Sequence, residues 1–549
     1  MTPSQPQPQP QPIVIYDTTL RDGAQREGIA LSLTDKLHIA QTLDELGVPF
    51  IEGGWPGANP KDVQFFWRRQ ETPLKQAQLV AFCSTRRPGR NAAEDPLLQA
   101  ILTAGTRWVT IFGKSWDLHV TEGLKTELSE NLAMISDTVA YLVSQCRQVI
   151  YDAEHWFDGY KHNPDYALQT LKAAWDAGAS WLVLCDTNGG TLPHEVSTII
   201  AAIFAAYPEL RTDPDAPKLG IHTHNDGELA VANAIAAVQA GVTMVQGTIN
   251  GYGERCGNAN LCSLIPNLQL KLGYDCLPPQ QLAKLSPASR AISEMVNLAP
   301  DDHAPFVGRS AFAHKGGIHV SAVARNPKTY EHLDPAAIGN ERRIVISEQA
   351  GVSNVMAKAR TFGIELDPKG TACRQILQQL KELESAGYQF EAAEASFELL
   401  MRSALGQRPQ PFILKGFQVT CDIWQAIAQF CGNNALATIK VSVNDEELLE
   451  VAEGNGPIAA LDGALRKALV RFYPEIAHFH LTDYKVRILE SRSGTNARTR
   501  VLVESSNGED YWSTVGVSTN IIDASYQAVV EGIEYGLLRA NQAVLTVQR

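Results

Sequence analysis

Two short stretches of this 549-residue sequence carry the residue types that metal-assisted chemistry on an anion requires. In the first stretch, Arg21 and Asp22 follow an apolar run, residues 13–16, that is typical of a buried strand. The arginine can bind a carboxylate through two parallel hydrogen bonds, and the aspartate can ligate a hard divalent cation. Taken alone, the two residues would be better explained as a surface ion pair on a loop.

The second stretch, His222-Thr223-His224, supplies two further candidate ligands. Side chains two residues apart on a strand point the same way, so both imidazoles can reach one ion. In a closed barrel the first and seventh strands end at the same mouth, which would bring Asp22 to the histidines. These nitrogen and oxygen ligands fit Mn²⁺, Mg²⁺ or Zn²⁺. Asn258 either adds an oxygen ligand or forms a turn beside Gly257.

A repeated strand–helix pattern between residue 13 and about residue 275 would position these groups. Amphipathic segments such as 35–46 and 166–177 separate the expected strands. Eight such units in about 260 residues predict an α/β fold, a (β/α)8 TIM barrel. A doubly wound open sheet is the alternative, but no G-x-G-x-x-G follows the first strand. The expected strands are residues 13–16, 49–53, 79–83, 108–112, 149–153, 181–185, 219–222 and 244–248.

The barrel domain is expected to span residues 13–280, with other regions on either side. Residues 1–12 alternate Gln and Pro and predict a disordered tail. Residues 281–410 predict a helical linker region whose polar loops, with His319 and Tyr330, contribute to the active site.

Residues 411–549 predict a C-terminal α+β domain made of short strands, turns and two helices. Two segments, 455–470 and 518–533, resemble each other, and each follows strand-like sequence and opens an amphipathic helix. This similarity predicts duplicated βα units, although two short units could also resemble each other by accident. Duplicated units suit a regulatory or dimerisation domain.

The composition limits the kinds of partner and the compartment that we expect for this protein. The net charge of −13 argues against a nucleic-acid partner, which requires a basic face. The sequence contains no apolar run of the length that a membrane span needs. Nine scattered cysteines do not form a disulfide framework, and the amino-terminal stretch lacks the pattern of a signal or transit peptide. We therefore expect a cytoplasmic protein.

The motifs Leu20-Arg21-Asp22-Gly23-Ala24-Gln25 and His222-Thr223-His224-Asn225-Asp226 resemble the two signatures of the acyl-CoA-condensing, metal-dependent barrels. These are the 2-isopropylmalate, homocitrate and citramalate synthases, with related lyases. The resemblance covers nearly the whole chain beyond the tail. It implies a divalent metal, acetyl-CoA as co-substrate and a homodimer. One departure is Glu228, where relatives often carry Gly, and we expect it to affect loop geometry but not ligation.

Three further segments, 53–62, 112–117 and 152–159, resemble the branch of the family that condenses acetyl-CoA with pyruvate in isoleucine synthesis. Sister branches that take 2-oxoisovalerate or 2-oxoglutarate share the metal ligands and are the close alternative. A lyase is disfavoured by the long carboxyl-terminal region, and a catalytically silent regulatory barrel is the remote alternative.

The resemblance also implies the roles of individual residues. Arg21 would bind substrate and stabilise developing charge, while Gln25 and Thr187 would bind substrate. Glu154 and His319 would belong to the catalytic machinery, with Tyr330 as a further hydrogen-bonding group, and the base is not assigned between Glu154 and His319. The plain alternatives are a strand-end ion pair for Glu154, a helix cap for His319, packing for Tyr330 and a turn for Thr187. The implied metal ligands are Asp22, His222, His224 and Asn258.

Feedback inhibition by isoleucine is a further expectation from the resemblance. Backbone N–H groups at the starts of the two carboxyl-terminal helices could bind the carboxylate of an amino acid. The residues expected there are Gly454, Gly456, Gly516 and Asn520.

Overall fold

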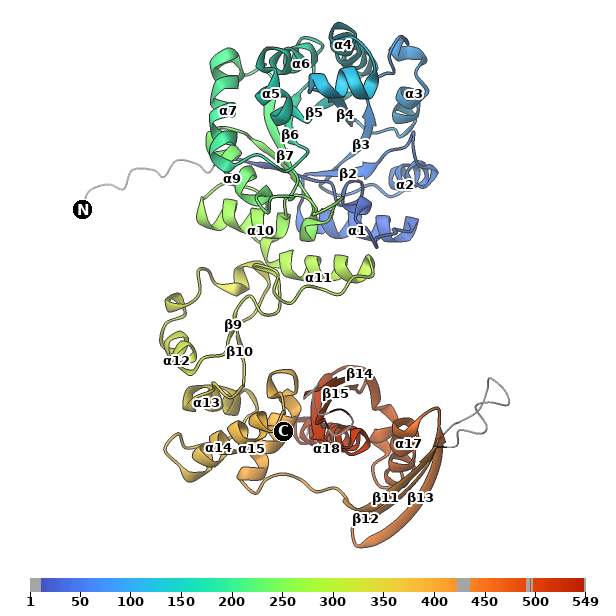
Figure 1. Ribbon diagram of the computed structural model, residues 1–549, viewed down its shortest axis with the longest axis vertical. Coiled ribbons are helices and arrows are strands. Elements are labelled where there is room, and N and C mark those ends of the chain that lie inside the picture. Colours follow the sequence, from blue (N-terminus) through green and yellow to red (C-terminus); the bar gives the residue numbers. More distant parts are fainter. Residues whose placement is uncertain (1–10, 422–434, 490–493, 495–496, 548–549) are drawn as a thin grey trace, which may run out of the picture. The chain divides into compact units, whose positions relative to one another are not determined.

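The computed structural model describes residues 11–421, 435–489, 494 and 497–547 (Figure 1). The chain forms two compact units, which we describe separately. The first comprises residues 1–312 and 332–342, and the second comprises residues 313–331 and 343–549. Most of the predicted tail, residues 1–10, lies outside the described residues, whereas Pro12 forms a parallel bridge with Asp275.

The first unit is a closed barrel of eight parallel strands in sequence order, with β8 paired to β1. The predicted TIM barrel is confirmed, and the open-sheet alternative is wrong because these edge strands pair with each other. Each predicted strand is present, with ends displaced by no more than two residues. The strands are β1 (Val14–Asp17), β2 (Phe50–Gly54), β3 (Gln78–Ser84), β4 (Trp108–Lys114), β5 (Gln148–Glu154), β6 (Trp181–Asp186), β7 (Lys218–Thr223) and β8 (Met244–Gly247).

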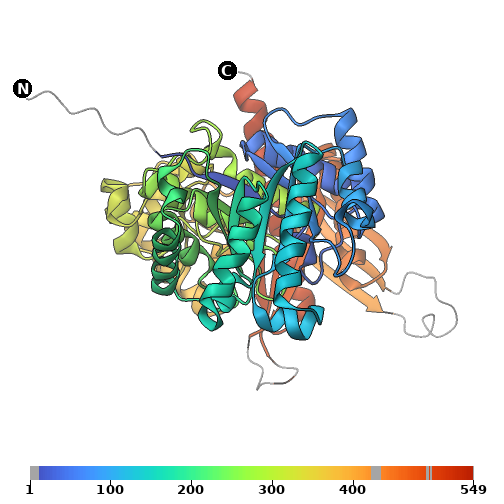
Figure 2. The same ribbon diagram turned by 90° about the horizontal axis from the view of Figure 1, so that it is seen from above.

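Helices cover the outside of the barrel (Figures 1 and 2). They begin where the sequence supplies caps: at α1, the Ser32 hydroxyl accepts from the Asp35 N–H and the Asp35 carboxylate accepts from the Ser32 N–H. Gly47 ends α1 in the left-handed region, with φ of 87°. The main helices are α1 (Leu33–Leu46), α2 (Pro60–Glu71), α3 (Pro96–Thr103), α4 (Leu128–Ser144), α5 (Trp156–His162), α6 (Pro164–Asp176), α7 (Pro193–Ala206), α9 (Ala230–Ala240), α10 (Leu261–Pro266) and α11 (Leu285–Met295).

A small buried cluster of strand residues, separate from the main core, contains Tyr16, Val183 and Met244. Other buried strand residues are polar: Glu52, Thr110, Asp152 and Gln246. Buried polar groups require hydrogen-bond partners, so these four residues must be held in defined positions. That polar layer positions the groups of the candidate site.

The second unit opens with helices. A short parallel pair, β9 (Ala313–His314) and β10 (Arg343–Ile344), accompanies α12 (Gly317–Arg325), α13 (Val352–Thr361), α14 (Thr371–Ser385) and α15 (Glu394–Ala404). Their apolar faces share a core that includes Val355, Ile376 and Phe397. Helices are therefore present where the sequence predicted a helical linker region, residues 281–410.

Two similar halves complete the second unit, which confirms the predicted duplication of βα units. Each half is a three-stranded antiparallel sheet followed by a helix, and both helices pack into one shared core. The first half contains β11 (Ile413–Cys421), β12 (Ala435–Val443), β13 (Glu446–Gly454) and α17 (Pro457–Leu469). The second contains β14 (His480–Ile488), β15 (Thr499–Ser506), β16 (Tyr511–Ser518) and α18 (Ile521–Val547).

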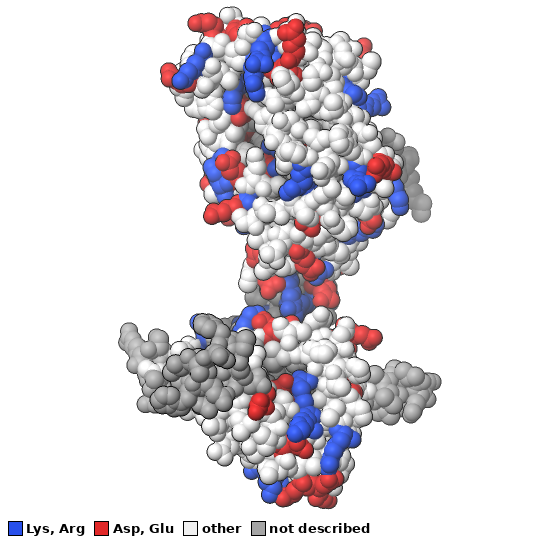
Figure 3. Space-filling model, turned by 90° about the vertical axis from the view of Figure 1, so that its right-hand side faces the viewer, with Lys and Arg blue, Asp and Glu red and all other residues white. Residues whose placement is uncertain are grey.

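The surface carries mixed charge. On the face drawn in Figure 3, acidic and basic side chains are interspersed over both units. Among the described residues, no helix combines the length and the apolar character that crossing a membrane requires.

In each half, a glycine on the last strand allows the following helix to pack closely. A Cβ at Gly454 would lie 2.5 Å from the backbone nitrogen of Ala460, and one at Gly516 would overlap with the carbonyl oxygen of Ala524. Neither contact can be relieved by a side-chain rotation, because the neighbouring atoms belong to the backbone.

Gly516→Ala should therefore destabilise the second unit by about 2 kcal/mol, which lowers its melting temperature by roughly 4–8 °C. Gly416→Ala is the matched control, since no atom lies within 4 Å of a Cβ at Gly416. Calorimetry of both variants tests this expectation. Equal melting temperatures would show that the strand and the helix are not in close contact.

Candidate active site

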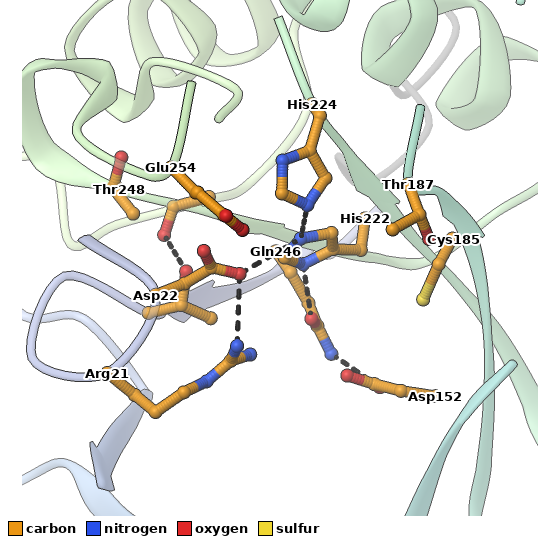
Figure 4. A network of polar contacts seen from close by, with 12 residues as sticks. Arg21, Asp22, Asp152, Cys185, Thr187, His222, His224, Gln246, Thr248 and Glu254 are labelled. Carbon is orange, nitrogen blue, oxygen red and sulfur yellow. Dashed lines mark hydrogen bonds and ion pairs between the residues drawn. The ribbon is translucent and has the colours of Figure 1, made fainter. Parts of the chain in front are cut away.

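The carboxyl ends of the barrel strands surround a cavity of about 230 Å³ (Figure 4). Most of the residues expected from sequence to act together line this one cavity, although they are widely separated along the chain. The sequence-predicted residues that line it are Arg21, Asp22, Gln25, Glu154, Thr187, His222 and His224.

Asp22, His222 and His224 form the only group of three potential ligands that the described residues bring within reach of one metal ion, with ligand atoms within 4.8 Å of one another. The His222 Nε2 atom lies 3.4 Å from Asp22 Oδ2 and 3.3 Å from His224 Nε2. All three side chains are buried.

Several buried polar atoms around this group lack hydrogen-bond partners among the described residues. They are Asp22 Oδ1, His224 Nδ1, and both the Oδ1 and Nδ2 atoms of Asn258. Asn258 forms an antiparallel backbone bridge with His224, which places it beside a candidate ligand. Because unpartnered buried polar groups are rare, this donor set fits a divalent cation.

The charges of two of the three candidate ligands, Asp22 and His224, suit metal binding; at His222, burial would lower the pKa but the hydrogen bond to Asp22 raises it. Burial alone would raise the pKa of Asp22, but the Arg21 guanidinium and His222 outweigh it and hold that pKa well below its usual range. Burial, together with the nearby His222, lowers the pKa of His224 to about 3. An ionised carboxylate and a neutral imidazole are the forms that ligate metals.

Arg21 is held by three contacts. Its Nε atom forms an ion pair with the buried Glu52, its Nη1 atom lies 3.1 Å from Asp22 Oδ2, and its guanidinium carbon lies 3.8 Å above the centre of the Phe82 ring. Tyr16 donates a hydrogen bond to the other Glu52 oxygen at 2.8 Å. The orientation of the guanidinium is thus fixed before any substrate binds.

Glu154, Thr187 and Gln25 lie around the same cavity. Glu154, the last residue of β5, forms an ion pair with Lys114 at the end of β4. The Thr187 hydroxyl accepts a hydrogen bond of 2.9 Å from the His155 N–H, so its own proton can point toward another acceptor. Gln25 belongs to the short helix that follows Asp22 and is exposed.

His319 and Tyr330 belong to the second unit, where their ring centres lie 4.2 Å apart. His319 is an exposed residue of α12, and Tyr330 has an exposed fraction of 46%. The structure thus pairs these residues with each other, and their participation in catalysis stays a prediction.

The four residues expected at the effector site lie at the starts of the two carboxyl-terminal helices or on the strands before them. Gly456 is the N-cap of α17, and the Asn520 side chain accepts a 3.0 Å hydrogen bond from the Ile522 N–H at the start of α18. Gly454 and Gly516 provide the close packing described above. Binding of an effector by these residues stays a prediction.

Sequence reasoning missed several residues of the site. Glu52 was not given a role, although a carboxylate at the end of a strand was a signal. Gln246 was missed entirely, and the signal was an amide in the apolar strand β8. Three aromatic residues that line the cavity, Trp55, Phe82 and Phe112, were also missed.

Glu228 has a φ of 60°, in the left-handed region that glycine adopts most readily. An effect of this residue on loop geometry stays a prediction, while both histidines belong to the group of potential ligands.

Models of known protein families match the barrel, the region that follows it and the carboxyl-terminal halves. The sequence matches the HMGL-like family over residues 12–292, the homocitrate synthase post-HMGL domain-like family over 306–387, and the LeuA allosteric (dimerisation) domain over 391–537.

Individual relatives indicate which branch of the family this chain resembles most. The (R)-citramalate synthase of Synechocystis sp. is 71% identical over 95% of this chain and 96% of its own length. That of Aquifex aeolicus is 51% identical over 96% and 98%. A 2-isopropylmalate synthase of Synechococcus sp. is 31% identical over 95% of this chain and 94% of its own length. The chain therefore belongs to the HMGL-like barrel enzymes and, within them, to the (R)-citramalate synthase family.

Proposed function

We propose that this chain condenses acetyl-CoA with pyruvate and water to give (R)-citramalate and CoA, in the synthesis of isoleucine. The observation that carries the proposal is one small cavity in which a fixed arginine lies beside a buried Asp–His–His group and a wall of aromatic side chains. High identity to (R)-citramalate synthases over nearly the whole chain supports it.

Asp22, His222 and His224, with Asn258, would hold a divalent cation, which we propose to be Mg²⁺ or Mn²⁺, with Zn²⁺ as the alternative. When bound, the cation supplies Lewis acidity that polarises the keto group of pyruvate. The unpartnered atoms of Asp22 and Asn258 support this ligand set.

The remaining groups of the cavity bind and orient the substrate. Arg21 would bind the pyruvate carboxylate or the oxygen on which charge develops, since Glu52 and Asp22 fix its plane. Thr187 would donate its free proton to the carboxylate, because its oxygen already accepts from His155. Gln25 would contact substrate at the edge of the cavity.

A base must remove one proton from the methyl group of acetyl-CoA. Glu154 lines the cavity and is one candidate, and His319, with Tyr330 beside it, is the other. The resulting enolate carbon forms a bond to the keto carbon of pyruvate, whose oxygen takes up a proton. Water then cleaves the thioester and releases CoA, which makes the reaction irreversible.

The aromatic wall favours a small 2-oxo acid. The rings of Phe82 and Phe112 stack with centres 5.3 Å apart, and Trp55 meets both edge-on at 5.7 Å. Three mutually packed rings cannot move aside without losing contact with one another, so a larger acyl side chain would meet a rigid surface. Such a surface favours pyruvate over 2-oxoisovalerate, the substrate of a sister branch.

Pyruvate should therefore exceed 2-oxoisovalerate by well over tenfold in kcat/KM, because a misfit of one methylene costs roughly 1–3 kcal/mol. Phe112→Ala should reduce this ratio by opening the wall, while Phe112→Leu, which keeps most of the volume, is the control. CoA release measured with each oxo acid tests both expectations. Equal or better use of 2-oxoisovalerate by the wild type would contradict the proposal.

The carboxyl-terminal region would bind isoleucine and join two chains into a homodimer. Its match to the LeuA allosteric (dimerisation) domain supports both parts of this proposal. The carboxylate of isoleucine would meet the N–H groups at the starts of α17 and α18, near Gly456 and Asn520.

Isoleucine should inhibit the full chain at subsaturating acetyl-CoA, with a coupling of about 1–3 kcal/mol. Gly456→Asp should abolish this response, since the new carboxylate would occupy the helix start that isoleucine needs. Gly456→Ala is the matched control, because φ of −170° is extended backbone and no atom lies within 4 Å of the added Cβ. The readout is the ratio of turnover with and without isoleucine. If millimolar isoleucine left the turnover of the wild-type chain unchanged, this part of the proposal would be refuted.

A further inference from the structure

A buried chain of hydrogen bonds runs from His222 through Gln246 to Asp152 (Figure 4). The Gln246 Oε1 atom lies 2.8 Å from His222 Nδ1, and Gln246 Nε2 donates to Asp152 Oδ1 at 3.0 Å. The three side chains come from β7, β8 and β5, and none is more than 4% exposed. Gln246 is completely buried and is not among the residues that line the cavity, so it can act only through its neighbours.

The ionised form of Asp152 sets the order of donors and acceptors in this chain. An ionised carboxylate only accepts, so the amide nitrogen of Gln246 then faces Asp152 and the amide oxygen faces His222. An amide oxygen also only accepts, so His222 Nδ1 must carry the proton. In a neutral imidazole this leaves the lone pair on Nε2, the atom that lies 3.4 Å from Asp22 and 3.3 Å from His224.

The second histidine lacks such support. His224 Nδ1 is buried and has no hydrogen-bond partner among the described residues. The tautomer of His222 is therefore selected by the protein, whereas hydrogen bonding to Nδ1 does not select that of His224.

We infer that Asp152 and Gln246 are positioning residues that hold His222 as its Nδ1–H tautomer, with Nε2 directed at the cation site. The inference deepens the proposed function, since it rests on the proposed metal site. It gives Asp152 and Gln246 a role in metal affinity that is separate from contact with substrate.

Gln246→Leu removes the acceptor and the donor while keeping a similar volume. The affinity for Mn²⁺, measured by calorimetry, should fall by about 10- to 100-fold, the usual cost of removing a partner of a ligating histidine. Raising the metal concentration should recover much of the lost turnover. Nitrogen-15 spectra of the metal-free protein, labelled at histidine, should show that the Nδ1–H signal of His222 is lost or mixed with the other tautomer.

The double variant Asp152→Asn/Gln246→Glu reverses the roles of the two partners and keeps their combined charge. A carboxylate at position 246 accepts from His222 and from the new amide, so the Nδ1–H tautomer should be retained and Mn²⁺ affinity should lie within about threefold of wild type. This rescue distinguishes positioning from packing, because a loss due to packing alone would not depend on hydrogen-bond direction. It also provides a folded variant if Gln246→Leu is unstable.

Two results would overturn the inference: an Nε2–H tautomer of His222 in the metal-free wild type, or wild-type Mn²⁺ affinity in Gln246→Leu. Neither measurement uses a substrate. Failure of the inference is therefore distinguishable from failure of the proposed reaction, which would appear as absent turnover with intact metal binding.

Discussion

Pairing of β8 with β1 is the interaction on which the rest of the site depends. The register from Val14–Met244 to Asp17–Gly247 closes the barrel and brings the loop after β1 against the ends of β7 and β8. Asp22 thereby lies 3.4 Å from His222, although the two residues are far apart in sequence. Without closure the ligands would lie at opposite edges of an open sheet.

Closure also buries charged groups, and pairing stabilises part of that charge. Glu52 is fully buried and holds Arg21 and Tyr16 with its two oxygens. Asp152 is buried close to Glu52, and burial, together with that neighbouring charge, raises its pKa to about 7. Removing one member of such a group leaves the buried charge of another without a partner. This loss destabilises the fold more than the loss of a surface ion pair does. The polar layer that orients the groups of the candidate site is thus costly to bury, and its geometry is fixed.

Sequence reasoning predicted those features that are local. The strands were visible because each is an apolar run, and the candidate ligands because Asp22 and the two histidines adjoin strand ends. The partners of these residues were not visible. Which side chain meets Gln246 depends on the stagger of β5, β7 and β8, and no pattern within one strand records that stagger. The positions of His319 and Tyr330 likewise depend on the arrangement of a second unit, about which the motifs carry no information.

The helix starts of the carboxyl-terminal halves illustrate the same limit. Similarity between residues 455–470 and 518–533 was sufficient to predict duplication, because helix-opening sequence is local. The packing function of Gly454 and Gly516 was not predictable, because it arises from contact with the backbone of the following helix.

Crystals of the chain grown with Mn²⁺ and pyruvate would test the central claim most directly, through the anomalous signal of the metal. We expect one strong peak in the barrel mouth, within about 2.0–2.3 Å of an Asp22 oxygen and of the Nε2 atoms of His222 and His224. We also expect the pyruvate carboxylate beside Arg21. A peak elsewhere, or one ligated without Asp22, would show that the proposed metal site is wrong.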